Sequence, residues 1–391
     1  MGSTVKKAIL KTRICDLLGI EYPVLCAGMG SFFFPLPAVT GARLAAAISR
    51  AGGMGVLGAG MMTLDEMRQA IRDVRNMTDR PFGVDLILPA NIDQHTRDIQ
   101  ALSDITFDTI RELMPAPQLE FLAELKRELG IGDHPVILKR DLTTFRPRDA
   151  VDICLEERVP VFVAGLGNPS FMISDARAQG MVVMGLVGNV KNARRIVESG
   201  VDVVIAQGTE AGGHTGRVGT LALIPQVVDA VTPVPVLAAG GIGDGRGLAA
   251  ALSLGADGAW VGTAFIATDE ADEYDFNKQK LIDVNEEGTR VTKVYTGKTM
   301  RGIQNELIRR WEEADLQTLP MPLQTFLMAE LTAGIIAEGK IDYISGPGGQ
   351  VAGMISGVRP AKDVLNDIVA GAIAVLTKEL PRRVLTEESG I

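Results

Sequence analysis

The sequence predicts a (β/α)8 barrel of the TIM-barrel class, with a smaller, mainly helical inserted domain. Short apolar runs bounded by Gly or Pro alternate with helical patterns, which is typical of repeated βα units. Eight such runs favour a closed barrel over an open doubly wound sheet, which is the alternative. The composition agrees, because 44 glycines, 46% hydrophobic residues and only 5% aromatic residues are typical of covered parallel strands.

The predicted strands and helices follow one another through most of the chain. Each strand is a buried apolar run, and each helix carries apolar residues at helical spacing. The strands are expected at residues 22–26, 54–58, 82–87, 160–164, 181–187, 201–207, 234–241 and 258–265. The helices between them are expected at residues 41–51, 63–76, 147–157, 190–199, 221–231 and 246–254.

Two stretches interrupt this alternation. Residues 95–146 carry helical patterns at 96–114 and 118–129, and a ninth apolar run at 136–138 that would shift the strand count. Residues 268–345 carry helical patterns at 305–314 and 326–338, and a last helix at 361–380 is expected to close the barrel. The predicted barrel domain therefore comprises residues 1–267 and 346–391, with a helical insertion at about 95–146. The small helical, substrate-side domain comprises residues 268–345.

Charge and cysteine usage exclude several classes of protein. The net charge is −9 and no strongly basic run is present, which argues against a nucleic-acid partner. Cys15, Cys26 and Cys154 lie far apart, without a C-x-x-C pair or a Cys/His cluster, so no metal site is expected. No run of about 18 uncharged apolar residues occurs. The sequence therefore predicts a soluble, cytoplasmic protein that does not bind membranes.

One histidine is notable for the loop that carries it. His214 ends the glycine-rich segment Gly208-Thr-Glu-Ala-Gly-Gly-His214, directly after the strand predicted at 201–207. Imidazole titrates near neutral pH, and glycines allow a backbone to approach a ligand closely. His214 is therefore the candidate catalytic residue, and an ordinary loop histidine is the alternative.

The next two strands also end in glycine-rich turns, Ala239-Gly-Gly-Ile242 and Val261-Gly-Thr263. In a barrel, the ends of the seventh and eighth strands commonly form a phosphate site at a helix N-terminus. Glycine leaves the main-chain N–H groups accessible, and the Thr263 hydroxyl adds a donor. These turns predict a phosphate site, with tight turns as the alternative reason for the glycines.

A phosphate site in an Ala- and Gly-lined barrel mouth suits a compact phosphorylated cofactor. FMN, pyridoxal phosphate or a sugar phosphate would each suit it. Pyridoxal phosphate needs a strand-borne lysine for its Schiff base, and none of the eight runs contains one. Dinucleotide-type glycine patterns at 53–58 and 245–250 lack the required strand-to-helix context. FMN is therefore the preferred cofactor.

Several motifs together carry a resemblance to a known family. They are Tyr22-Pro-Val-Leu-Cys-Ala-Gly-Met29, Phe82-Gly-Val-Asp85, the segment that ends at His214, the two strand-end turns, Tyr295-Thr-Gly-Lys298, Arg301-Gly302 and Gly349-Gln350. With these motifs the chain closely resembles the nitronate monooxygenases, formerly called 2-nitropropane dioxygenases. The flavin-dependent enoyl-acyl-carrier-protein reductases are near relatives that share most of the motifs.

The resemblance implies a flavoprotein with FMN and a role for each matching residue. His214 would stand over the flavin face, as a base toward a nitroalkane α-carbon or as a cationic partner of a nitronate, and oxygen would complete the turnover. Gly241, Gly262 and Thr263 would hold the phosphate, with Gly240 adjacent. The other residues expected at the cofactor are Ala27, Gly28, Met29, Asp85, Gln207, Gly208, Gly213, Gly349 and Gln350.

Two positions depart from the family pattern. Asp85 stands where many members carry Asn beside the flavin, so its carboxyl is expected to be protonated or turned away, with a strand-end cap as the alternative role. The fifth strand reads Met184-Gly-Leu-Val187 where some nitronate oxidisers carry a lysine. The missing lysine makes the pattern more like the reductase branch.

Three functional hypotheses follow. The leading one is an oxidoreductase, a monooxygenase that oxidises alkyl nitronates with molecular oxygen. The first alternative is an enzyme that reduces enoyl thioesters or quinones with NAD(P)H. The second alternative is a flavin- or phosphate-binding protein without turnover. All three bind small molecules; the sequence leaves the physiological substrate and the oligomeric state open, with a homodimer as one arrangement.

Overall fold

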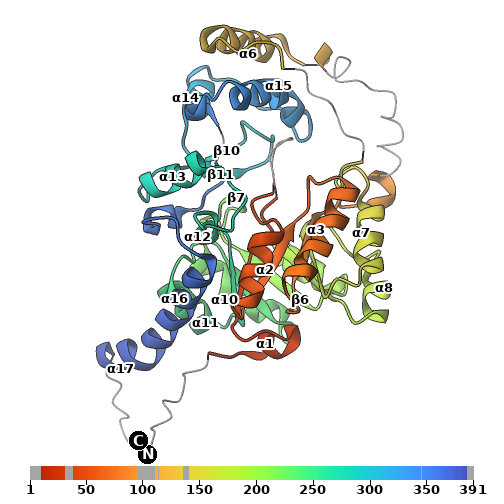
Figure 1. The fold of residues 1–391 in the computed structure, drawn as a ribbon, viewed down its shortest axis with the longest axis vertical. Coiled ribbons are helices and arrows are strands. Elements are labelled where there is room, and N and C mark those ends of the chain that lie inside the picture. Colours follow the sequence, from red (N-terminus) through yellow and green to blue (C-terminus); the bar gives the residue numbers. More distant parts are fainter. Residues whose placement is uncertain are drawn as a thin grey trace, which may run out of the picture.

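Eight parallel strands form a closed barrel in the computed structural model, which describes residues 10–30, 38–95, 111–112, 114–134, 141–344 and 346–384 (Figure 1). The strand order is β1-β2-β3-β4-β5-β6-β8-β9, and β9 pairs with β1. The predicted TIM barrel is confirmed, and each predicted run overlaps one strand. The strands are β1 (Val24–Cys26), β2 (Met54–Gly58), β3 (Gly83–Ile87), β4 (Val161–Leu166), β5 (Val182–Val187), β6 (Val203–Gln207), β8 (Val236–Ala239) and β9 (Gly258–Val261).

Helices surround the barrel wall. They are α2 (Ala42–Arg50), α3 (Leu64–Met77), α7 (Pro147–Glu156), α8 (Ile173–Ala178), α9 (Val190–Glu198), α10 (Thr220–Val231), α11 (Gly245–Ser253) and α16 (Ala361–Ala374). The last of these packs against α11 and α2, so it fills the place between the last and first strands, as predicted. A π-helical turn (Val375–Glu379) and α17 (Leu380–Arg383) follow it.

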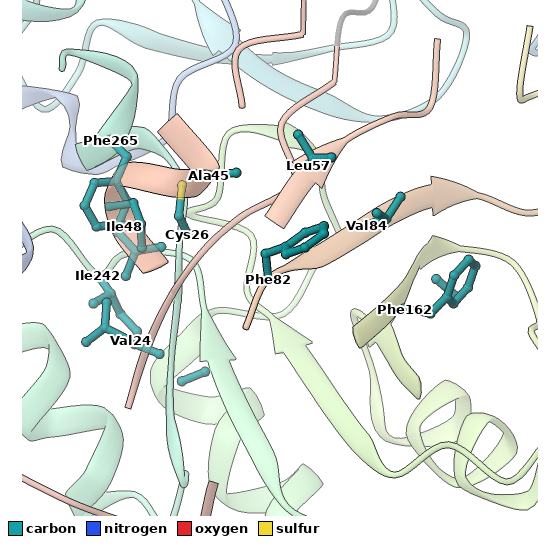
Figure 2. Close-up of a cluster of buried hydrophobic side chains, with 14 of the residues drawn as sticks. Val24, Cys26, Ala45, Ile48, Leu57, Phe82, Val84, Phe162, Ile242 and Phe265 are labelled. Atoms are coloured by element: carbon teal, nitrogen blue, oxygen red, sulfur yellow. The ribbon is translucent and has the colours of Figure 1, made fainter. Parts of the chain in front are cut away.

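Alternate strand residues face opposite sides of the barrel wall. On β1, Leu25 faces the barrel interior, whereas Val24 and Cys26 pack outward toward the helices. Figure 2 shows this outer layer, with Cys26 beside Ile48 of α2. The helix α1 (Arg13–Leu18), which was not predicted, packs against the interior residues and closes the amino-terminal end of the barrel. The opposite end is left for the site.

The two insertions meet in a small body beside the barrel. This small body lies in the upper part of Figure 1. Its helices are α6 (Ala116–Leu129), α13 (Asp275–Asp283), α14 (Glu306–Glu313) and α15 (Leu323–Ala337). Leu125 of α6, Trp311 of α14 and Leu331 of α15 share one hydrophobic cluster. We therefore propose that α6 belongs to this body; the domain boundaries at 267/268 and 345/346 stay predictions.

The small body also contributes strands. The strands β7 (Gly213–His214), β10 (Thr289–Thr292) and β11 (Met300–Ile303) form an antiparallel sheet in the order β10-β11-β7. These short strands were not predicted, because none is a long apolar run. The predicted run at 136–138 and most of the helix at 96–114 lie outside the described residues.

Among the described helices, none is both long and apolar enough to cross a membrane.

Candidate active site

A cavity of about 210 Å³ lies at the carboxyl ends of the barrel strands, the end at which TIM-barrel enzymes place their active sites. Residues from distant parts of the sequence line it together. Most of the predicted site residues are among them: Ala27, Gly28, Met29, Asp85, Gln207, Gly213, His214, Gly240, Gly241, Gly262, Thr263 and Gly349. The fold therefore brings the candidate catalytic histidine into the same cavity as the two glycine-rich turns.

Two predicted residues do not line this cavity. A Cβ added to Gly208 would lie 2.0 Å from Thr220 Oγ1, so Gly208 allows its loop to pack closely on the start of α10. The Gln350 residue is exposed, and its main-chain N–H donates to the Glu210 carbonyl over 2.9 Å. Both residues stabilise the loops around the cavity.

Three groups hold His214 in place. In β7, His214 pairs with Met300 of β11, so the small body fixes its backbone. The Gln207 side-chain amide donates to the His214 carbonyl over 2.7 Å. On the ring, Nε2 lies 3.0 Å from the hydroxyl of Thr296, which is only 3% exposed. The segment Tyr295-Thr-Gly-Lys298 is one of the motifs that carry the family resemblance, but the sequence did not predict the contact between Thr296 and His214.

The environment of His214 favours a neutral ring. Burial, and to a lesser extent the charge of Lys298, lowers the pKa of His214 to about 4. The Thr296 hydroxyl donates toward the Lys298 carbonyl over 3.3 Å, so the same hydroxyl is able to accept from an Nε2–H. At pH 7 the imidazole is therefore neutral.

The two glycine-rich turns present unpaired main-chain donors. Gly240 and Gly241 have φ angles of +89° and +71°, which glycine adopts without strain. Within the described part of the chain, no main-chain acceptor is found for the N–H groups of Gly241, Gly262 and Thr263. The Thr263 hydroxyl accepts from the Gly349 N–H over 2.9 Å and still has its own proton to donate. These groups suit an anionic oxygen acceptor.

Three carboxyl groups also line the cavity: Asp85, Glu210 and Glu273. Glu210 accepts from the N–H and the hydroxyl of Thr220, each over 2.9 Å, so its carboxyl group is held at the first turn of α10. The pKa of Glu273 is raised, because the effect of burial outweighs that of the hydrogen bonds from the Asn277 amide and the Tyr274 N–H, which lower it. Glu273 could not be predicted as a site residue, because only the tertiary fold brings the acidic stretch at 269–274 to the cavity.

Much of the remaining lining is apolar, which suits a flat aromatic ligand. Most of the larger apolar side chains come from six barrel strands or the turns that follow them, and two come from later segments. They are Met29, Ile87, Leu166, Leu186, Ile242, Trp260, Met321 and Val351.

Comparison with known proteins agrees with this arrangement. The family model "Nitronate monooxygenase" matches residues 11–371. A "Probable nitronate monooxygenase" of Staphylococcus saprophyticus is 33% identical over 346 residues, which cover 85% of this chain and 90% of that protein. Among solved structures, a nitroalkane oxidase from Streptomyces ansochromogenes is 30% identical with a TM-score of 0.74, covering 93% of this chain and 99% of its own. FabK from Thermotoga maritima is 31% identical with a TM-score of 0.73, covering 96% and 100%. The chain therefore belongs to the nitronate monooxygenase family, whose members are flavin-dependent oxidoreductases.

Proposed function

We propose that this protein binds FMN at the barrel mouth and oxidises alkyl nitronates with molecular oxygen. One observation carries the proposal: a half-buried histidine and two strand-end turns with N–H groups that lack a protein acceptor share one cavity. The solved relative named as a nitroalkane oxidase supports the substrate class. The cytoplasmic location and a homodimer stay predictions.

The residues present fit FMN rather than a free flavin base. Gly241, Gly262 and Thr263 would hold the phosphate, because their N–H groups lack a described protein acceptor. The apolar lining that includes Met29 and Leu186 would hold the ring. When bound, the flavin supplies the electron transfer that no amino-acid side chain provides.

His214 would orient the substrate and exchange its proton. Burial, and to a lesser extent Lys298, lowers the pKa of His214 to about 4. The neutral ring would accept the α-proton of a nitroalkane and so produce the nitronate that is oxidised. The alternative role, a cationic partner of a nitronate, would require a protonated ring, which the lowered pKa of His214 disfavours at neutral pH. Lys298 acts on the ring by its charge and would supply the positive charge that attracts an anionic nitronate.

The test begins with the purified protein. We expect a yellow protein with a flavin spectrum, from which denaturation releases FMN. Addition of a nitronate under anaerobic conditions should bleach the flavin, and oxygen should restore the colour. Colourless protein that cannot be reconstituted with FMN would contradict the cofactor assignment.

Two further measurements separate the alternatives. The match to FabK makes NADH the necessary control: rapid anaerobic bleaching by NADH, without bleaching by nitronate, would favour the reductase hypothesis. The His214→Ala variant should bind FMN normally and lose about 10²- to 10⁴-fold in kcat/KM. If His214→Ala loses no activity with any candidate substrate, the result would favour the second alternative, a flavin- or phosphate-binding protein without turnover.

A further inference from the structure

Asp85 is a buried ionisable side chain of the cavity with close backbone neighbours. It lies on β3, is 9% exposed and lines the cavity. Two glycines enclose it: a Cβ added to Gly28 would lie 2.3 Å from Asp85 Cβ, and one added to Gly165 would lie 2.4 Å from Asp85 Oδ1. Neither neighbour tolerates a side chain without displacing Asp85, so the carboxyl group is held in a single place.

The two oxygens of this carboxyl group have different surroundings. Oδ1 accepts a hydrogen bond from the Gly165 N–H over 3.0 Å. For Oδ2, no donor lies within hydrogen-bonding distance among the residues with described positions, yet this atom is not sealed from the cavity. Oδ2 is therefore the atom that is available to a ligand.

No charged group compensates a negative charge at this position. The residues that neighbour Asp85 are Gly28 after β1, Gly58 of β2, and Val163 and Gly165 of β4, and none has a titratable side chain. The thiol of Cys26 on β1 packs on the other side of the barrel wall, toward the helices. The other titratable groups that line the cavity are Glu210, His214 and Glu273, and none of them perturbs Asp85. Burial therefore raises the pKa of Asp85 well above its usual range, and the single hydrogen bond from Gly165 opposes this only in part.

We propose that Asp85 contacts the flavin ring as a neutral carboxylic acid, with Oδ2–H donating a hydrogen bond to an acceptor atom of the ring. This inference rests on the proposed function, because it needs the flavin in this cavity. An Asn at the same position would present the same groups: its carbonyl would accept from Gly165, and its NH2 would donate into the cavity. Asp85 would therefore donate the same hydrogen bond as the Asn expected from the family. Unlike the amide, the carboxylic acid stops donating at high pH, when it loses its proton.

The test measures FMN binding by the apoprotein as a function of pH. Wild-type protein and the Asp85→Asn variant are titrated with FMN between pH 6 and about pH 10, with flavin fluorescence as the readout. For the wild type we expect Kd to rise about tenfold per pH unit once Asp85 ionises, because only the protonated form donates. For Asp85→Asn we expect a Kd within about threefold of the wild-type value at pH 6 and no such rise. All other titratable groups are shared, so the difference between the curves reports Asp85.

Infrared spectroscopy supplies an independent readout on the wild type. The wild-type minus Asp85→Asn difference spectrum at pH 7 should contain the C=O stretch of a protonated carboxylic acid, even if the variant is less stable. Superimposable pH curves, a missing C=O band, or a more than tenfold weaker Kd of Asp85→Asn at pH 6 would each overturn the inference. Failure of both proteins to bind FMN at any pH would instead contradict the proposed function.

Discussion

Lys298 tunes the basicity of His214 through its charge. Burial, and as the smaller contribution the charge of Lys298, lowers the pKa of His214 to about 4, so the ring stays neutral into the acid range. Replacing Lys298 by Gln removes the positive charge, which raises the pKa of His214 toward its usual value. The acid limb of kcat/KM should therefore move to higher pH in Lys298→Gln, with activity at pH 5 falling relative to activity at pH 8.

Lys298→Arg is the matched control, because it keeps the charge. Its acid limb should stay at the wild-type pH, measured with the same nitroalkane so that substrate ionisation is common to all curves. An identical limb in Lys298→Gln and the wild type would show that Lys298 does not act on His214.

Thr296 is a positioning residue for the same ring. Its buried hydroxyl lies 3.0 Å from His214 Nε2. Thr296→Val keeps the shape and removes this hydrogen bond, which typically contributes about 0.5–1.5 kcal/mol. We expect kcat/KM to fall about 3- to 10-fold, while the Kd for FMN stays constant and the pH profile shifts. Thr296→Ser should restore the rate and the profile; loss of FMN binding in Thr296→Val would point to a merely structural role.

Among the elements, α16 depends on close backbone contact with α11. A Cβ added to Gly245 of α11 would lie 2.3 Å from the backbone of Gly371 and Ala372 in α16. Because backbone cannot rotate aside, Gly245→Ala should force the two helices apart and lower the free energy of unfolding by about 1–3 kcal/mol. Chemical denaturation of the holoprotein measures this.

Gly357 offers a matched control, since a Cβ there meets nothing within 4 Å. Gly357→Ala should change the free energy of unfolding by no more than about 0.5 kcal/mol. Equal effects of the two substitutions would mean that α16 is not held by this contact.

The elements also show how far the sequence alone reaches. All eight barrel strands were predicted, because buried parallel strands are continuous apolar runs. The strands β10 and β11 were missed, since their pairing comes from the tertiary fold rather than from a local pattern. The same division holds at the site: the glycine-rich turns and His214 follow local motifs, whereas the Thr296 contact and the position of Glu273 depend on how the small body meets the barrel.

For the whole molecule, the two tryptophans report on the two bodies separately. Trp260 lies on β9 and lines the cavity, whereas Trp311 packs in the small body, with its ring edge-on to Phe121 at 5.5 Å. These side chains belong to different hydrophobic clusters. Variants that keep one tryptophan, Trp311→Phe and Trp260→Phe, therefore follow the unfolding of each body.

We expect the two bodies to unfold with different midpoints and to respond differently to FMN. Most predicted ligand contacts come from the barrel, so FMN at 100 times its Kd should stabilise the barrel by about 2.7 kcal/mol. The midpoint seen by Trp260 should rise more than the midpoint seen by Trp311 in urea titrations of each variant with and without FMN. Circular dichroism is measured on both variants as a common probe, and it shows whether either substitution itself changes the unfolding transition. Coincident transitions that shift together would show instead that the antiparallel pairing of β7 with β11 couples barrel and small body into one cooperative unit, with His214 at their junction.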